Sequence, residues 1–128
     1  MSGIKKLSAT TPKTVLYCGE PCVAVPAVVA QAAGVEVEAK KVVKAGTPVS
    51  GDLTARDTAF TKATSSGTPA ASNAVGVMLH DVDVTDGDEN ASVLLFGFVD
   101  LGKLDSDVAA LITDEVKAAL DGKITFLK

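Results

Sequence analysis

The sequence predicts a mainly β domain with one or two short helices. Val93 to Val99 form a nearly continuous apolar run, which is typical of a buried strand. Apolar residues from Val75 to Val84 at short spacing predict a second strand, and the polar turn Thr85–Asn90 joins the two, with Gly87 able to take a positive φ. We expect a sheet built on this strand pair to form the core, with the other segments covering or extending it.

Composition indicates one domain with an unusual core. The chain has 128 residues, which is the size of a single domain. Its residues are 47% apolar, but only 4% are aromatic and Trp is absent. Small Val and Ala side chains bury little area each, so each stabilises the fold weakly at about 25 cal/mol per Å². We therefore hypothesise that the subunit completes its burial against partners.

The charge of the chain argues against a nucleic-acid partner, and the shortness of its apolar stretches argues against a membrane span. The net charge is -4 and Arg56 is the single arginine, whereas nucleic-acid readers usually carry a basic stripe with Arg. The longest apolar stretch, Val23–Ala33, contains Pro26 and is too short to span a bilayer. No apolar segment follows Lys5 and Lys6 as in a secretory signal, so we expect synthesis in a reducing cytoplasm.

The first thirteen residues, Met1–Lys13, are polar, lack a sustained period and are interpreted as a flexible arm. Fully extended, such an arm reaches about 43–47 Å. It could add a strand to the exposed sheet edge of a partner, where main-chain hydrogen bonds supply the affinity. The alternative is a tail without a role. Residues 14–128 are expected to form a single β-rich domain.

The amino-terminal half of that domain predicts short strands. Thr14–Tyr17 is the first candidate. Val23–Ala33 is ambiguous, because Pro26 either breaks a strand ladder or begins a short helix. Val35–Ala39 alternates apolar and acidic residues, which predicts a half-exposed strand.

Next, Val42–Val49 reads as a strand that runs into a Gly-Thr-Pro turn and then into another extended piece. Proteins use this pattern where a strand crosses the corner of a small β-barrel or β-clip. Ala63–Asn73 is low in complexity and is expected to be an exposed loop. Ile124–Leu127 predicts a final strand.

Two short helices are expected between the central strands and the carboxyl end. Asp105 or Ser106 could cap the first, which would run to Ile112. Thr113 is the candidate cap of the second, and Gly122 is expected to end it at the C′ position. The apolar stripe of that second helix consists of Val116, Ala119 and Leu120.

Cys18 and Cys22 could close a small disulfide loop, offer two metal thiolates or remain as reduced thiols. A structural zinc site needs four ligands, and His80 is the only histidine. We favour two reduced or partly buried thiols. His80 and Asp81 are neighbours on a predicted strand and point to opposite faces, so they do not form a catalytic dyad by themselves.

An acidic string raises the possibility of calcium. An EF-hand with Gly87 at its sixth position would place Val82 and Val84 at ligand positions, where neither can ligate. An irregular Ca²⁺ site and a solvated, like-charged turn remain as alternatives. The string consists of Asp81, Asp83, Asp86, Asp88 and Glu89. The sequence assigns no catalytic, cofactor-binding or metal-binding residue.

A second local pattern, Glu38-Ala39-Lys40-Lys41, resembles the modified-lysine hairpin of biotinyl carrier domains, in which Glu-Ala-Met-Lys-Met is expected. The alternative function is therefore a small barrel-sandwich carrier or ligand-binding module.

Two longer stretches, Lys41–Asp52 and Ala74–Leu104, resemble bacteriophage head decoration proteins of the lambda type. The shared features are the Gly-Thr-Pro turn after a strand, the Ala-Val-Gly-Val strand and the apolar strand with Gly and Phe. The closing segment Ala118–Leu127 is similar to the carboxyl end of such proteins. Cys18, Cys22 and the segment Val23–Ala33 depart from the pattern.

This resemblance implies a β-clip-like fold, a homotrimer and a non-enzymatic role in the virion. Such trimers bind the outer surface of the expanded capsid and reinforce it against the pressure of packaged DNA. In that family the amino-terminal arm contacts the major capsid protein. The residues implied for that contact are Ile4, Lys5, Lys6, Leu7, Ser8, Thr10 and Thr11.

Overall fold

The structure is a computed structural model and describes residues 22–67 and 70–127. Within these ranges the fold is mainly β with two short α-helices, which confirms the fold class predicted from the sequence. Its elements are β1 (Val23–Val29), η1 (Gln31–Ala33), β2 (Val35–Val37), β3 (Lys40–Val43), β4 (Pro48–Ser50), β5 (Thr61–Lys62), β6 (Ser65–Ser66), β7 (Ala71–Ser72), β8 (Gly76–Met78), β9 (Val82–Asp83), β10 (Glu89–Asp100), η2 (Leu101–Lys103), α2 (Ser106–Ala109), α3 (Asp114–Ala119) and β11 (Ile124–Leu127).

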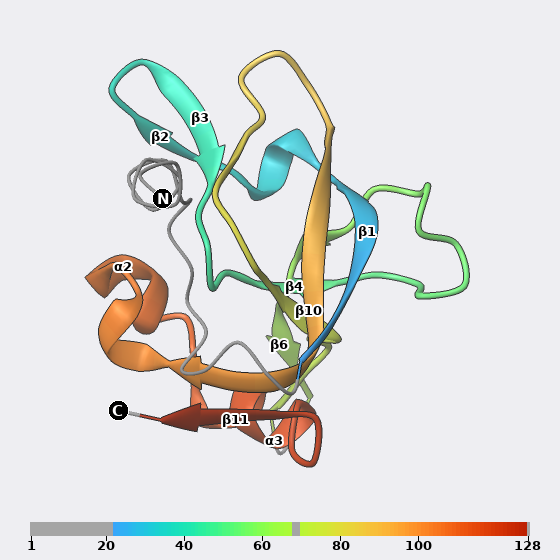
Figure 1. Ribbon diagram of the computed structural model, residues 1–128, viewed down its shortest axis with the longest axis vertical. Helices are drawn as coiled ribbons and strands as arrows, with labels where there is room; N and C mark the ends of the chain where they lie inside the picture. The colour runs from blue at the N-terminus through green and yellow to red at the C-terminus, as the bar shows by residue number, and fades with distance from the viewer. Residues whose placement is uncertain (1–21, 68–69, 128) are drawn as a thin grey trace, which may run out of the picture.

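The long strand β10 organises the main sheet (Figure 1). The described strands are ordered β1-β10-β8-β4-β5, and β11 pairs with the carboxyl half of β10 in parallel. β8 and β10 are antiparallel, with Val77 opposite Leu94 and Met78 opposite Val93. The predicted pair of central strands is therefore confirmed. Its parallel partner β11 comes from the last described residues of the chain.

A second sheet has the order β2-β3-β9. The expected strand from Val75 to Val84 is wrong in one respect, because it is divided between the two sheets. Its first part is β8, whereas β9 pairs with β3. The carboxylate of Asp81, between β8 and β9, accepts a hydrogen bond of 2.7 Å from the backbone N–H of Ala45. This bond fixes the chain beside the end of β3, where it changes sheet.

The main sheet curls until its two edges meet at one point. Phe60 donates its backbone N–H to Val28 and accepts from the N–H of Ala30, both at 2.8 Å, and it forms a parallel bridge with Val29. Phe60 and Val29 are fully buried in the apolar cluster inside the curl. The sheet thus approaches a small barrel without closing along its length.

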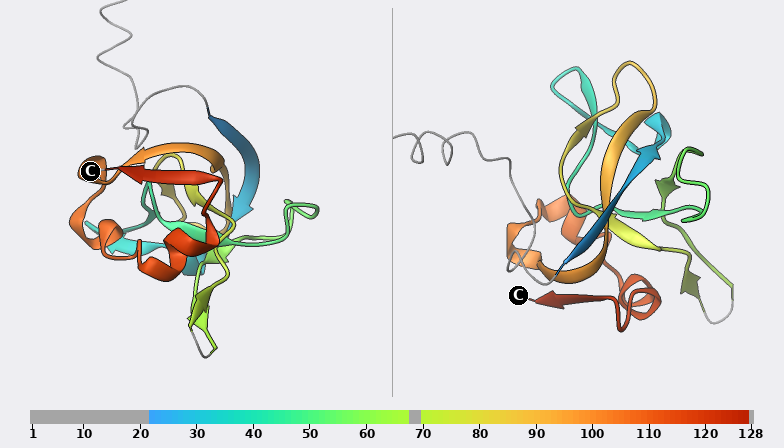
Figure 2. Two further views of the ribbon diagram at one scale, coloured as in Figure 1. Left: turned by 90° about the horizontal axis from the view of Figure 1, so that it is seen from below. Right: turned by 45° about the vertical axis from the view of Figure 1, so that its right-hand side comes forward.

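The two helices cover a second apolar cluster at the end of the molecule that carries β11 (Figure 2). Thr113 caps α3 as predicted, since its side chain accepts from the N–H of Val116. The predicted C′ position of Gly122 is wrong: α3 ends at Ala119, Leu120 is the cap and Asp121 intervenes before Gly122, whose φ is +79°. No helix in the described ranges is long and apolar enough to cross a membrane.

Two further expectations need correction. Ala63–Asn73 contains a short antiparallel ribbon, β6 with β7, and is not wholly a loop. The side chain of Asn73 accepts from the N–H of Thr64 and closes the base of this ribbon. Pro26 neither breaks the ladder nor begins a helix, because it lies inside β1 opposite Ser92.

Candidate partner-binding surface

The residues implied for capsid contact lie outside the described part of the chain. This holds for the whole arm Met1–Lys13, for the candidate strand Thr14–Tyr17 and for Cys18. The described chain begins at Cys22, directly before β1. The amino-terminal segment therefore joins the described domain at the start of β1.

The strand β10 changes the face that it buries near its middle. Leu94 and Val99 are an odd number of residues apart, yet both belong to the cluster under the helices. In a regular strand such residues point to opposite faces. The ladder with β1 shifts register between Val23 and Ala24, opposite the step from Leu94 to Phe96. This bulge inserts one residue and turns the rest of β10 over.

The change of face places an apolar surface on the outside of the sheet. Val23 and Phe96 are Cα partners, so their side chains share a face, and they are 52% and 41% exposed. Phe98 lies on the same face two residues on, beside its Cα partner Thr125, and Leu127 continues the row. We call this surface the outer face; it consists of Val23, Phe96, Phe98, Thr125 and Leu127.

The strand β11 leaves one backbone edge open beside this face. Gly97 donates its N–H to the carbonyl of Lys123, so Gly97 and Val99 point their backbone groups toward β11 in the parallel ladder. The N–H and C=O of Phe126 then point away from β10, and β11 pairs with no other described strand. Such an edge is a template for an added strand.

The outer edge of β1, in contrast, is largely closed. Val28 uses both backbone groups toward the segment that ends at Phe60, accepting from Phe60 and donating to the carbonyl of Arg56 at 3.0 Å. Pro26 faces the same side, where it has no N–H to offer, and its carbonyl accepts from Arg56 Nη1 at 2.7 Å. Because Pro26 lacks its donor on this side alone, the ladder with β10 stays intact.

A shallow groove of about 550 Å³ lies over this closed edge. Its walls include Leu53, which is 40% exposed, and the side chains of Arg56, Asp57 and Asn90. Apolar residues, among them Pro26, also line the groove. The groove therefore mixes charged, amide and apolar groups, unlike the outer face.

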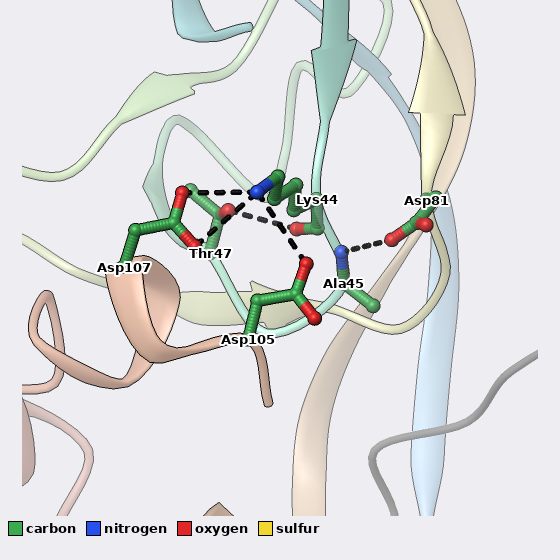
Figure 3. A network of polar contacts seen from close by, with 6 residues as sticks. All are labelled: Lys44, Ala45, Thr47, Asp81, Asp105 and Asp107. Carbon is green, nitrogen blue, oxygen red and sulfur yellow. Dashed lines mark hydrogen bonds and ion pairs between the residues drawn. The ribbon is translucent and has the colours of Figure 1, made fainter. Parts of the chain in front are cut away.

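The corner between β3 and β4 is held to α2 by an ion cluster (Figure 3). Lys44 Nζ lies 3.0 Å from Asp107 and 3.4 Å from Asp105. The hydrogen bond to Asp107 raises the pKa of Lys44, and the same bond lowers the pKa of Asp107. The cluster ties two segments that are far apart in sequence, and its carboxylates are engaged within the domain.

The Gly-Thr-Pro turn has a clear structural reason. Gly46 has a φ of +91°, and a Cβ at this position would overlap Leu104 Cδ2. Thr47 is buried and donates its hydroxyl to the carbonyl of Lys44 at 2.7 Å (Figure 3). Pro48 then begins β4. The motif therefore builds the corner that brings β3 and β4 against the helices.

Two carboxylates of the acidic string stabilise the turn between β9 and β10. Asp83 accepts from the backbone and hydroxyl of Thr85, and the hydroxyl bond lowers the pKa of Asp83 most. Asp88 accepts from the N–H of Gln31 at 2.8 Å. Within residues 22–67 and 70–127, no group of three or more His, Cys, Asp or Glu side chains is placed to hold a metal ion.

Cys22 carries a free thiol and is half-buried against the cluster under the helices. The sequence argues against a catalytic dyad of His80 and Asp81. In the structure the Asp81 carboxylate accepts from the Ala45 N–H, and His80 is half-buried. Cys22, His80 and Asp81 are therefore interpreted as structural residues of the domain.

The sequence analysis did not predict the outer face, because it assigned Phe96 and Phe98 to one buried run. A continuous apolar run carries no alternation from which faces can be read. The only signal was Gly97, which separates the two rings. No protein-family model matches the chain, and no curated protein matches it in sequence.

Proposed function

We propose that the chain is a phage capsid decoration protein, which binds the mature head as a homotrimer and stabilises it against internal DNA pressure. The observation that carries the proposal is the spatial relation of the two stretches that resemble such proteins. Pro48 pairs with Val77, and Val77 pairs in turn with Leu94. Stretches separated by more than twenty residues thus form adjacent strands β4, β8 and β10, as expected if they are parts of one inherited unit.

The distribution of charge supports an arm that acts outside its own domain. Met1–Lys13 contains three of the 12 basic side chains and no Asp or Glu, so the remainder carries all 16 acidic side chains against nine basic ones. A basic arm on an acidic domain suits contact with an acidic partner surface, here the major capsid protein, and its approach is steered electrostatically.

The trimer would stabilise the capsid because it binds one form of the shell selectively. Each trimer would bridge neighbouring capsomers and bury a standard-size interface, roughly 1,200–2,000 Å² of total surface, at each contact. Because the trimer binds the expanded shell and not its earlier form, binding stabilises the expanded shell by mass action. This mechanism requires no reactive group and no cofactor.

Deletion of Met1–Lys13 tests the proposal. We expect the truncated protein to remain folded and trimeric and to lose co-sedimentation with expanded heads of the encoding phage that lack their own decoration protein. The full chain serves as the control. A Lys5→Gln/Lys6→Gln variant keeps the backbone of the arm but removes two of its three charges, so it should bind heads more weakly than the full chain and more strongly than the truncated protein. Undiminished binding of the truncated protein would defeat the proposal.

The hairpin of β2 and β3 is the observation that favours the carrier alternative. β2 and β3 form a tight hairpin whose two turn residues, Glu38 and Ala39, have φ of 50° and 69°. Lys40 is exposed at its exit, but Lys41, which matches the modified lysine of biotinyl carriers, is half-buried in β3 opposite Glu36.

Intact mass after co-expression with a biotin ligase separates the two functions. The decoration proposal predicts an unmodified mass, whereas one added biotinyl group would establish the carrier. Size-exclusion chromatography with light scattering adds a second discriminator, because a trimer is expected for the decoration protein and a monomer for the carrier.

A further inference from the structure

The outer face is an apolar surface without a covering element among the described residues. Phe96 is 41% exposed and Val23 52%, and Phe98 and Leu127 are half-buried beside them. The chain has only four Phe, one Tyr and no Trp. Half of its Phe side chains therefore lie on one outer surface, in a protein whose buried residues are mostly Val and Ala. Such a patch marks an interaction site.

The chain enters the domain at the rim of this face. Cys22 packs against the cluster under the helices, and the next residue, Val23, is already part of the face. Tyr17 precedes Cys22 by five residues. Because an extended chain spans at most about 3.3–3.6 Å per residue, Tyr17 lies within about 18 Å of Cys22. This tether gives the preceding segment a high effective concentration at the outer face.

The chemistry of that segment fits the face. Thr14–Tyr17 reads Thr-Val-Leu-Tyr, is uncharged and has strand-forming residues. In an extended conformation Val15 and Tyr17 project to the same side. Gly19 and Pro21, between this segment and Cys22, are residues that allow the chain to change direction.

The other edge near the chain entry is unsuitable as a docking site. Arg56 and Pro26 close the edge of β1, and the groove above it contains the charged side chains of Arg56 and Asp57 among its lining residues. The outer face, with its neighbouring open edge at β11, is both nearer to Cys22 and more apolar.

We propose that Thr14–Tyr17 of the same chain docks on the outer face, with Val15 and Tyr17 packed against Phe96 and Phe98. The docked segment is an anchor, and Met1–Lys13 extends from it. This inference goes beyond the proposed function and does not depend on it, because it concerns the isolated protein and needs no capsid.

Tyr17 supplies its own probe, since it is the only tyrosine and the chain has no tryptophan. Quenching of its emission by acrylamide measures its accessibility. We expect Tyr17 in the full chain to be protected relative to free N-acetyltyrosinamide and Phe96→Ser to abolish that protection. Leu53→Ser is the matched control, because Leu53 is 40% exposed and lies in the groove; it should leave the protection unchanged.

A second variant, Val15→Asp, leaves the described domain untouched and should also abolish the protection, with an unchanged far-UV circular dichroism spectrum. Full accessibility of Tyr17 in the unmodified chain would overturn the proposal. So would protection that disappears on dilution together with the oligomer, since the occupant would then be a second copy. Protection that survives both Phe96→Ser and Val15→Asp would equally overturn it. Head binding is measured separately, so failure of either proposal is recognised by its own readout.

Discussion

The Nζ atom of Lys44 lies 3.0 Å from Oδ2 of Asp107, and this ion pair joins the corner after β3 to the first turn of α2. The two residues are separated by 63 positions in the chain. The contact depends on the tertiary structure, because it forms only when the sheet β2-β3-β9 and the helix α2 are both in place.

We expect Asp107→Asn to be less stable than the unmodified protein at neutral pH. The pKa of Asp107 is lowered from 3.8, so its contribution is present above that value and is lost as the pH falls through the lowered pKa. The pKa of Lys44 is raised from 10.5, so the same contribution is lost as the pH rises through the raised pKa. The difference between the two proteins should therefore narrow at both extremes.

Urea unfolding from acid to alkaline pH measures this dependence. The effect should be small, because exposed ion pairs are screened by water and salt. Asp121→Asn is the control, since it removes one carboxylate of the same chain without touching Lys44. A constant difference across the whole pH range would contradict the assignment.

Gly46→Ala should destabilise the domain by about 1–3 kcal/mol, since the added methyl meets both an unfavourable φ and Leu104. Gly122→Ala isolates the first effect, because Gly122 also has a positive φ, +79°, but nothing lies within 4 Å of its Cβ position. Denaturant midpoints of the two variants should differ, with Gly46→Ala the less stable. Equal midpoints would show that Leu104 yields without cost.

Opening the edge of β1 should promote association. Pro26→Thr restores a backbone donor, and Arg56→Ala frees the carbonyl of residue 26, so the double variant presents an unprotected strand edge. We expect light scattering to rise with concentration beyond the level of the unmodified protein. Lys117→Ala, which removes one exposed positive charge from α3, should not reproduce the effect.

Thr113→Ala should cost about 1 kcal/mol, because the side chain of Thr113 satisfies the N–H of Val116 at the start of α3. Thr113→Ser keeps the acceptor oxygen and should retain most of the stability. Thermal unfolding followed by circular dichroism compares the three proteins. A serine variant as unstable as the alanine variant would indicate that the methyl group, not the cap, stabilises the helix.

Local patterns predicted what local physics controls. Alternation identified the half-exposed strand β2, although Glu38 and Ala39, expected at its end, form the turn instead. An N-cap residue located the start of α3, and a Gly-Thr-Pro sequence located the corner before β4. These predictions succeeded because each depends on residues within a few positions of one another. The absence of alternation in the run from Val93 to Val99 left open which side chains point outward.

The amino-acid sequence by itself determined that this chain forms a mainly β domain with two short helices. Only the tertiary structure decided that Phe96 lies outward beside Val23, that β11 joins β10 in parallel and that the edge of β1 is closed by Arg56. The physical reason is that strand pairing and register are contacts between distant segments. A single inserted residue at the bulge reverses the faces of all residues that follow it.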